Sequence, residues 1–378
     1  ASRDILWPRI DAEYRQELDG IAAGAQSQGV KIDRWDVVAL NALEELPGYY
    51  LPWLEKQQGH PAPVDAPDHC SAFVATGSYT SDHHIVMGHN NWSDYVSGAR
   101  WNIIFDIAPE HGYRLMMDGL PGVIISDDDF DVNSAGLVIT ETTIGSFDGF
   151  DPKGSPEFYR ARKALQYASS IDDYVRIMLD GNNGGYANDW LLGDNKTGEI
   201  ALFELGLKNH KVWRTSDGYF IGSNFPVDPK LAREETHFDS KDPGISANAR
   251  RTRWEQLMKQ ARGQIDIELA KKFESDGFDV IQNKVDPAER SLCGCNELSP
   301  RGLGKDWGKF FPAGTVQSKV IDSTLAKEMS FWAALGHQCA KSFIADDFLK
   351  EHPEYEWMRG LLKNMYTGPW TEFSTKMK

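Results

Sequence analysis

The chain has 378 residues, 41% of them hydrophobic and 25% charged, and a formal net charge of −16. This balance is typical of a folded globular protein, and the length suffices for one large domain or two ordinary ones. No apolar run approaches the ~20 residues of a membrane-spanning helix. The negative charge, with no cluster of Lys and Arg, argues against nucleic acid as a partner. We therefore expect no membrane span and no nucleic-acid partner.

The first 45 residues show a helical pattern. Tyr14, Leu18, Ile21 and Ala25 recur at helical spacing on one face. The pair Asp33 and Asp36 predicts the cap of a second helix. The segment "GHPAPVDAPDH" (59–69) follows, with three prolines and no periodicity, which indicates a linker or an exposed loop.

From residue 70 the pattern changes to strands. "CSAFVATGS", "HIVMGHN", "WNIIFDIA", "YRLMMDG" and "GLVITETT" are short, apolar and separated by turn residues. Two helices follow, the first opened by Ser155 and Pro156, the second capped by Ser170 and ending at Gly181. Further strands are "NDWLLGD", "EIALFEL", "KVWRT" and "GYFIGSN". The chain from about residue 246 is interpreted as helices with irregular connections. These blocks predict an α+β protein with antiparallel sheets and helices packed outside them.

Cys70 stands where the proline-rich segment meets the first strand. A catalytic cysteine needs an accessible thiolate and a nearby base. Cutting the chain just before Cys70 would supply that base, because a free α-amino group has a pKa of ~7.7–8.0 and is partly neutral at pH 7. The alternative is a structural thiol buried in the core.

The other three cysteines lie far along the chain, in "CGC" (293–295) and "GHQC" (336–339). One interpretation is a disulfide between Cys339 and a cysteine of the triplet. We name Cys295 as its partner, and such a disulfide would suit an oxidising compartment. A second is a metal site from Cys293, Cys295, His337 and Cys339, although this spacing is not a standard zinc pattern. A third is reduced core thiols. We predict no metal.

The chain begins with Ala1 and not with Met, which is compatible with the removal of a leader. We therefore expect an exported protein, and a cytoplasmic protein is the alternative.

Several segments together resemble known families. "CSAFVATGSYTSDHHIVMGHNNWSDY" (70–95), "GLPGVIISDDDFDVNSAGLVITETTIG" (119–145) and "NNGGYANDWLLGD" (182–194) resemble the catalytic chain of the phospholipase B-like family. "ELDGIAAGAQSQG", "SLCGCNE", "GHQCAKSF" and "PWTEF" resemble bacterial relatives of the penicillin acyltransferases. Both groups are N-terminal nucleophile (Ntn) hydrolases, with choloylglycine hydrolases as more distant relatives. The resemblance covers nearly the whole chain and is carried by the order and spacing of the motifs.

This resemblance implies a four-layer αββα sandwich and autoproteolysis between His69 and Cys70. Residues 1–69 would then remain as a small propeptide chain packed on a catalytic chain, 70–378. It further implies that the substrate is a small-molecule acyl amide or a lipid and that no cofactor is needed. A homo-oligomer is compatible with this resemblance.

The resemblance also suggests roles at the site. Asn188 aligns with an asparagine whose side-chain amide binds the oxyanion in relatives. The alternative role for Asn188 is to cap the end of a strand. Glu141, Thr142 and Thr143 end a strand where relatives place a second polar group. Alternation puts Thr142 on the face opposite to the other two, and we favour Thr142 as the residue that meets Cys70.

Three further residues complete the predicted site. His89 stands where more distant relatives have Arg, and we expect it to be partly ionised beside the nucleophile; the alternative is a hydrogen-bonded core histidine. Trp92 would line the acyl pocket, or simply belong to the core. In "SANARRTRW", Arg250 and Arg253 are the candidates for a site arginine, with a solvated helix face as the alternative.

We therefore predict a self-processing hydrolase that cleaves an acyl-amide bond through a thioester on Cys70. Transfer to a second amine is the variant of this reaction, and deacylation of lipid esters is the close alternative. A catalytically inactive scaffold of the same fold is the alternative from another class of function.

Overall fold

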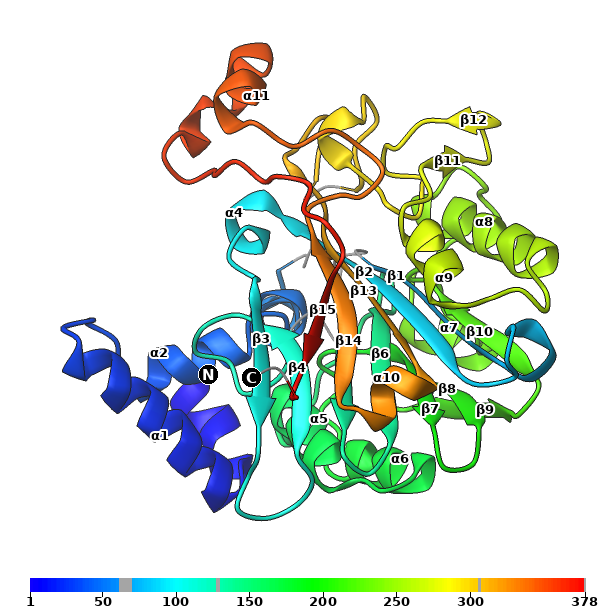
Figure 1. Ribbon diagram of the computed structural model, residues 1–378. Helices are drawn as coiled ribbons and strands as arrows, with labels where there is room; N and C mark the ends of the chain where they lie inside the picture. The colour runs from blue at the N-terminus through cyan, green and yellow to red at the C-terminus, as the bar shows by residue number, and fades with distance from the viewer. Residues whose placement is uncertain (61–69, 127–129, 305–306, 377–378) are drawn as a thin grey trace.

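The computed structural model describes residues 1–60, 70–126, 130–304 and 307–376, and it contains two large antiparallel sheets (Figure 1). The first sheet has, in spatial order, β10 (Gly218–Gly222), β1 (Cys70–Thr76), β2 (Val86–Asp94), β13 (Ala313–Asp322), β14 (Ser330–Leu335) and β15 (Thr371–Ser374). The second has β3 (Ile103–Ile107), β4 (Leu115–Gly119), β5 (Phe130–Asn133), β6 (Leu137–Thr143), β7 (Asn188–Asp194), β8 (Glu199–Leu205) and β9 (His210–Thr215).

The two sheets pack face to face over a shared apolar core. Ala72 and Val74 of β1 meet Val138 of β6 and Leu191 of β7 in this layer. Because successive strand side chains point to opposite faces, their neighbours Phe73 and Ala75 belong to a different cluster on the outer face of the first sheet. The alternation is what allows both faces of β1 to be buried.

Helices cover the outer face of each sheet. On the second sheet lie α1 (Ala12–Ser27), α2 (Arg34–Asn41), α5 (Glu157–Tyr167) and α6 (Ile171–Leu179), and on the first lie α8 (Ser246–Gln260) and α9 (Ile267–Glu274). The order helix, sheet, sheet, helix is the predicted αββα sandwich, which is confirmed. The smaller elements are α3 (Leu51–Gln57), α4 (Tyr95–Gly98), α7 (Pro229–Glu235), α10 (Ser323–Lys327), α11 (Ala345–Glu351) and the hairpin β11 (Phe278–Asp279) with β12 (Lys284–Val285). Within the described ranges no helix is long and apolar enough to span a bilayer.

The local signals of the early helices are confirmed. Asp33 accepts hydrogen bonds from the backbone of Trp35 and Asp36, and the Asp36 carboxylate accepts one from the Asp33 backbone, which completes a capping box on α2. Ser170 likewise accepts from the Asp173 backbone at the start of α6.

The interpretation of the last third as helices is wrong in part. Residues 313–322 and 330–335 form β13 and β14, and β13 pairs directly with β2. The sequence of β13, "AGTVQSKVID", has no apolar alternation, because Gln317 and Lys319 are buried polar residues that point between the sheets with the paired His89 and Asn91 of β2. A buried polar strand gives no period-two hydrophobic signal.

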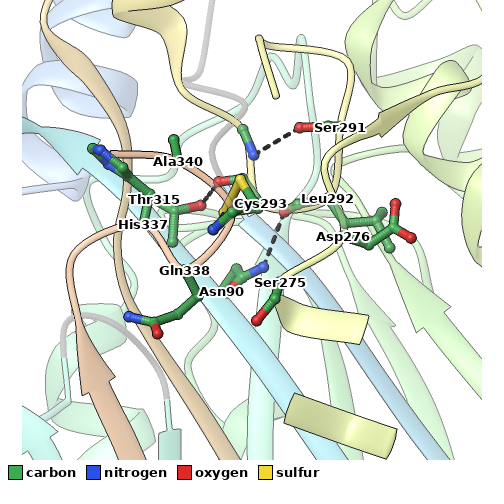
Figure 2. Close-up of a disulfide and its surroundings, with 12 residues drawn as sticks. Asn90, Ser275, Asp276, Ser291, Leu292, Cys293, Thr315, His337, Gln338 and Ala340 are labelled. Atoms are coloured by element: carbon green, nitrogen blue, oxygen red, sulfur yellow. Dashed lines mark hydrogen bonds between the residues drawn. A yellow bond between two sulfur atoms is a disulfide. The ribbon is translucent and has the colours of Figure 1, made fainter. Parts of the chain in front are cut away.

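The disulfide joins Cys293 to Cys339, with Cα atoms 6.1 Å apart (Figure 2). The predicted pairing of Cys295 with Cys339 is therefore wrong. All three sulfur atoms lie within 4.8 Å of one another, so sequence spacing could not separate the two pairings. Cys295 is a free, buried cysteine, and its backbone N–H donates to the Pro287 carbonyl at 2.8 Å.

The N-terminal segment is built into the core of the second sheet. Leu18 of α1 is fully buried and packs in one cluster with Ile139, Trp190 and Phe203 of the sheet. Residues 1–60 therefore lie against the rest of the chain as its outer helical layer. The predicted boundary at His69 lies outside the described residues.

Replacing Leu18 tests this packing. Leu18→Ala should lower the free energy of unfolding by about 2–5 kcal/mol, because it leaves a cavity under the sheet. Leu51→Ala, at a side chain 49% exposed, is the matched control and should change stability by less than about 0.5 kcal/mol. Chemical denaturation monitored by tryptophan fluorescence measures both. Equal effects of the two substitutions would contradict a core role for α1.

Candidate functional site

Cys70 is the first residue of β1 and is 4% exposed. It pairs with Asn91 of β2, and the β1–β10 ladder begins two residues later at Ala72. The neighbouring strands thus hold the backbone on the C-terminal side of Cys70 rigidly. The residue before it, His69, is outside the described part of the chain.

A buried arginine and an asparagine hold the start of β1. The Arg250 guanidinium of α8 donates to the Cys70 carbonyl, to the Ser71 hydroxyl at 3.1 Å and to the Asn224 side-chain oxygen at 3.0 Å. The same Asn224 oxygen accepts the backbone N–H of Cys70 at 3.1 Å. Arg250 also lies over the Trp92 ring, 4.5 Å from its centroid. Asn224 and Arg250 thereby pair the backbone N–H and C=O of Cys70.

Asn224 follows β10 and has a left-handed backbone, with φ +69. Asparagine is one of the few residues other than glycine that adopt this conformation readily. Its amide N–H donates to the Thr143 carbonyl at 3.0 Å, which connects the first sheet to the end of β6. Sequence reasoning missed Asn224; the signal was an asparagine at the end of the predicted strand "GYFIGSN".

Cys70 lines a cavity of about 200 Å³. Its wall is largely aromatic and includes Trp92, Trp101, Tyr186 and Trp307. The wall also contains three residues from the N-terminal segment and several polar residues of β2 and α4: Leu43, Glu44, Pro47, Asn91, Ser93, Asp94 and Ser97. Burial, together with the charge of Asp94, raises the pKa of Glu44 to about 7.

The three polar residues at the end of β6 divide between its two faces. Val138 faces the first sheet and Leu137 faces the helices, so alternation puts Thr142 toward the first sheet and Glu141 and Thr143 toward the helices. The packing agrees: a Cβ on Gly222 of β10 would lie 2.3 Å from the Thr142 hydroxyl oxygen. Thr142 is therefore the one of the three that faces the first sheet; that it meets Cys70 stays a prediction.

Asn188 lies on the same face as Glu141, because it pairs with Thr143 at the start of β7. With its amide nitrogen turned toward the carboxylate, Asn188 donates to Glu141 at 2.7 Å and to the Ala187 carbonyl at 2.9 Å. The Tyr186 hydroxyl lies 3.2 Å from Glu141 and 2.6 Å from the Thr143 hydroxyl. The Asn188 amide is thus occupied by a neighbouring carboxylate, and only Tyr186 of this network lines the cavity.

Asn91 offers the amide donor that Asn188 does not. It stands opposite Cys70 in the ladder, lines the same cavity and is 4% exposed. Its side-chain nitrogen has no hydrogen-bond partner among the described residues. A buried unpaired amide is costly unless it has a functional partner. Sequence reasoning quoted "GHNNW" but considered only His89 and Trp92 in it.

The surroundings of His89 favour its neutral form, whereas the sequence analysis expected it to be partly ionised. It is fully buried between the sheets, opposite Ala72 on one side and Lys319 on the other. Burial, reinforced by the positive charge of Lys319, lowers the pKa of His89 well below its usual value. The Lys319 ammonium itself lies 3.5 Å from the Asp118 carboxylate of β4.

The surroundings of Cys70 disfavour its thiolate in the continuous chain. Burial raises the pKa of the Cys70 thiol well above its ordinary value, and the negative charge of Glu141 raises it further. A hydrogen bond from the Trp92 backbone and the positive charges of Lys319 and Arg250 lower the pKa of the thiol, but by less than burial raises it.

Arg253 is the other arginine named as a candidate from the sequence. It pairs with Asp276 at 2.6 Å and does not line the cavity at Cys70.

Two groups of side chains in the described residues have the types and spacing of metal ligands. They are Cys293 with Cys295 and Cys339, and Cys295 with Glu297 and His337. Neither includes Cys70.

The fold and the site together define an αββα protein with a cysteine at the first position of a central strand. A family model described as Phospholipase B matches residues 1–205. The chain belongs to the phospholipase B family. It is 29% identical over 209 residues to phospholipase B-like 1 of Caenorhabditis elegans, covering 51% of this chain and 35% of that one. It is 29% identical over 218 residues to phospholipase B-like protein C of Dictyostelium discoideum, covering 50% and 37%.

The chain thus spans about a third of the length of these relatives. It is also similar to a mutant conjugated bile acid hydrolase from Clostridium perfringens, with a TM-score of 0.41 and 13% identity over 70% of this chain and 89% of that one.

Asn224 provides a test of the network around Cys70. Asn224→Ala leaves buried N–H groups of Cys70 and Arg250 without their acceptor, at about 1–3 kcal/mol for each unsatisfied group. Asn224→Gly accepts the positive φ and isolates the contribution of the side-chain amide. Both variants should unfold at lower denaturant concentration than the unmodified protein. An Asn224→Gly protein as stable as the unmodified one would contradict the network.

Proposed function

We propose that this protein hydrolyses or transfers an acyl group through the thiol of Cys70, after the chain is cut between His69 and Cys70. The observation that supports it is the position of Cys70: first in a central strand, lining a cavity, with its backbone N–H and C=O held by Asn224 and Arg250. A structural thiol would need neither the cavity nor the polar network.

Cleavage would supply the missing base. The described residues place no histidine against the thiol, and burial holds the thiol protonated. A freed α-amine on Cys70 would sit where Asn224 already accepts a hydrogen bond from the backbone nitrogen. Near pH 7 part of such an amine is neutral and can take the thiol proton. The resulting ammonium adds a positive charge beside the sulfur and favours the thiolate.

The reaction then runs in two halves. The thiolate attacks the acyl carbon, and the carbonyl oxygen becomes an oxyanion. The bond to the leaving amine breaks as the α-ammonium gives that amine its proton, leaving a thioester. Water, deprotonated by the α-amine, attacks the thioester and the sulfur leaves. The proton returns to restore the thiol. A second amine in place of water gives transfer.

Asn91 and the backbone N–H of Trp92 are the oxyanion donors that the geometry favours. The Asn91 amide nitrogen is unpaired among the described residues and shares the cavity with Cys70. The Trp92 N–H already acts on the sulfur. Asn188 would act indirectly, by holding the Glu141 carboxylate.

We take an amide as the first candidate substrate, and the cavity favours one with a small acyl or amine group. Its volume of about 200 Å³ is below the ~300–1,000 Å³ of pockets that enclose drug-sized ligands. The family description favours the second candidate, deacylation of lipid esters. Hydrolysis of matched N-acyl and O-acyl chains of increasing length separates the two.

Replacing Cys70 tests the nucleophile. The unmodified protein should separate under denaturing conditions into chains that end at His69 and begin at Cys70. Cys70→Ala should remain one chain and lose acyl hydrolysis, whereas Cys295→Ala, at the other free cysteine, should still be cut. Intact mass spectrometry measures the cleavage. A full-length Cys70 protein that shows no hydrolysis would support the inactive scaffold instead.

The two asparagines give a second test. Asn91→Ala should lower kcat by about 10²–10³-fold, the usual effect of removing one oxyanion donor, and leave stability nearly unchanged because it removes an unpaired group. Asn188→Ala should mainly lower stability, because it removes one hydrogen-bond donor from the buried Glu141 carboxylate. Steady-state kinetics and denaturation on both variants measure the contrast. The reverse pattern would return the oxyanion role to Asn188.

A further inference from the structure

A cluster away from Cys70 combines three different metal-binding groups. Cys295 and Glu297 lie in the segment that leads into β13, and His337 follows β14. One ligand atom from each lies within 4.8 Å of the others, and all three residues are buried. We propose that Cys295, Glu297 and His337 form a binding site for one divalent ion of the zinc class.

The hydrogen bonding of His337 suits a metal ligand. Its Nε2 lies 2.8 Å from the Lys341 carbonyl, to which it can only donate. In the neutral ring Nδ1 then carries the lone pair, and this atom is buried with no hydrogen-bond partner among the described residues. Metal-binding histidines usually donate their second ring N–H to a carbonyl in this way, which fixes the tautomer.

Glu297 and Cys295 supply the charge that the ion requires. The Tyr95 hydroxyl donates to one Glu297 oxygen at 2.5 Å, and the other Glu297 oxygen lies 3.7 Å from Nε2 of His337, the same nitrogen that faces the Lys341 carbonyl. A thiolate and a carboxylate together neutralise one divalent cation.

The mixture of sulfur, nitrogen and oxygen donors selects the metal. Ca²⁺ and Mg²⁺ prefer oxygen ligands alone. Zn²⁺ accepts Cys, His and Glu together, and three protein ligands leave a fourth position for water. Glu297 also lines a cavity of about 840 Å³ between the 297–298 segment and residues 340–352, which gives an ion and its water a path to the site.

The site would stabilise the back of the catalytic cavity. Gly294, beside Cys295, has φ +36 and lies so close to the Trp92 ring that a Cβ there would be 2.0 Å from it. Fixing Cys295 to His337 fixes the segment against which Trp92 packs. We therefore expect ion binding to raise the thermal stability of the protein rather than to take part in its chemistry.

Cobalt(II) is the probe, because its coordination can be seen directly. Titrated into the full-length protein without reductant, it should saturate at one equivalent and give a thiolate-to-cobalt absorption band. Cys295→Ser should lose the band, and Cys70→Ser, the matched change at the other free cysteine, should keep it. His337→Gln should weaken binding at least tenfold.

Thermal unfolding gives a second readout. Zn²⁺ should raise the unfolding temperature of Cys70→Ser but not that of His337→Gln. This comparison remains valid even if Cys295→Ser folds poorly.

Two results would overturn the proposal. One is no thiolate-to-cobalt band in a folded protein whose Cys295 thiol is titratable after unfolding. The other is a band that appears only after the disulfide is reduced and that Cys293→Ser abolishes, because the ligands would then be a different set of thiols.

Discussion

The structure around the first strand depends on one buried cation. The Arg250 guanidinium is fully buried, and removing such a group from water is costly unless its donors are paired. Here they are paired with the Cys70 carbonyl, Ser71 and Asn224, while the face of the group rests on Trp92. One side chain from the outer helical layer thereby positions the start of β1, the end of β10 and a wall of the cavity.

This constraint explains how a strand end can be both rigid and reachable. The ladder with β2 fixes Cys70, and Asn224 satisfies its backbone N–H, so the strand does not need a partner from the preceding residue. The N-terminal segment contributes Leu43, Glu44 and Pro47 to the cavity and Leu18 to the core. If the chain is cut as proposed, the small chain stays part of the site as well as part of the fold.

Much of the fold was predictable from the sequence, because the outer helices and the apolar strands have clear periodicity and caps. Of the candidate site, Cys70 and Arg250 were named from the sequence and lie together in the structure, while their roles stay predictions. The strand β13 could not be predicted from the sequence, because it carries buried polar residues that point between the two sheets. The same burial lowers the pKa of His89 and so disfavours the expected partial ionisation. Asn91 and Asn224 gave no motif, because their importance arises from contacts between segments distant in sequence.

Direct trapping of the nucleophile is the most decisive measurement. The purified protein would be treated with an acyl-like electrophile such as a β-lactone and then digested, and the peptide from the start of β1 sequenced by mass spectrometry. The account predicts a peptide that begins at Cys70, carries the acyl adduct on sulfur and has a free α-amine. An adduct at any other residue, or an adduct on Cys70 within a peptide that continues back through His69, would contradict it.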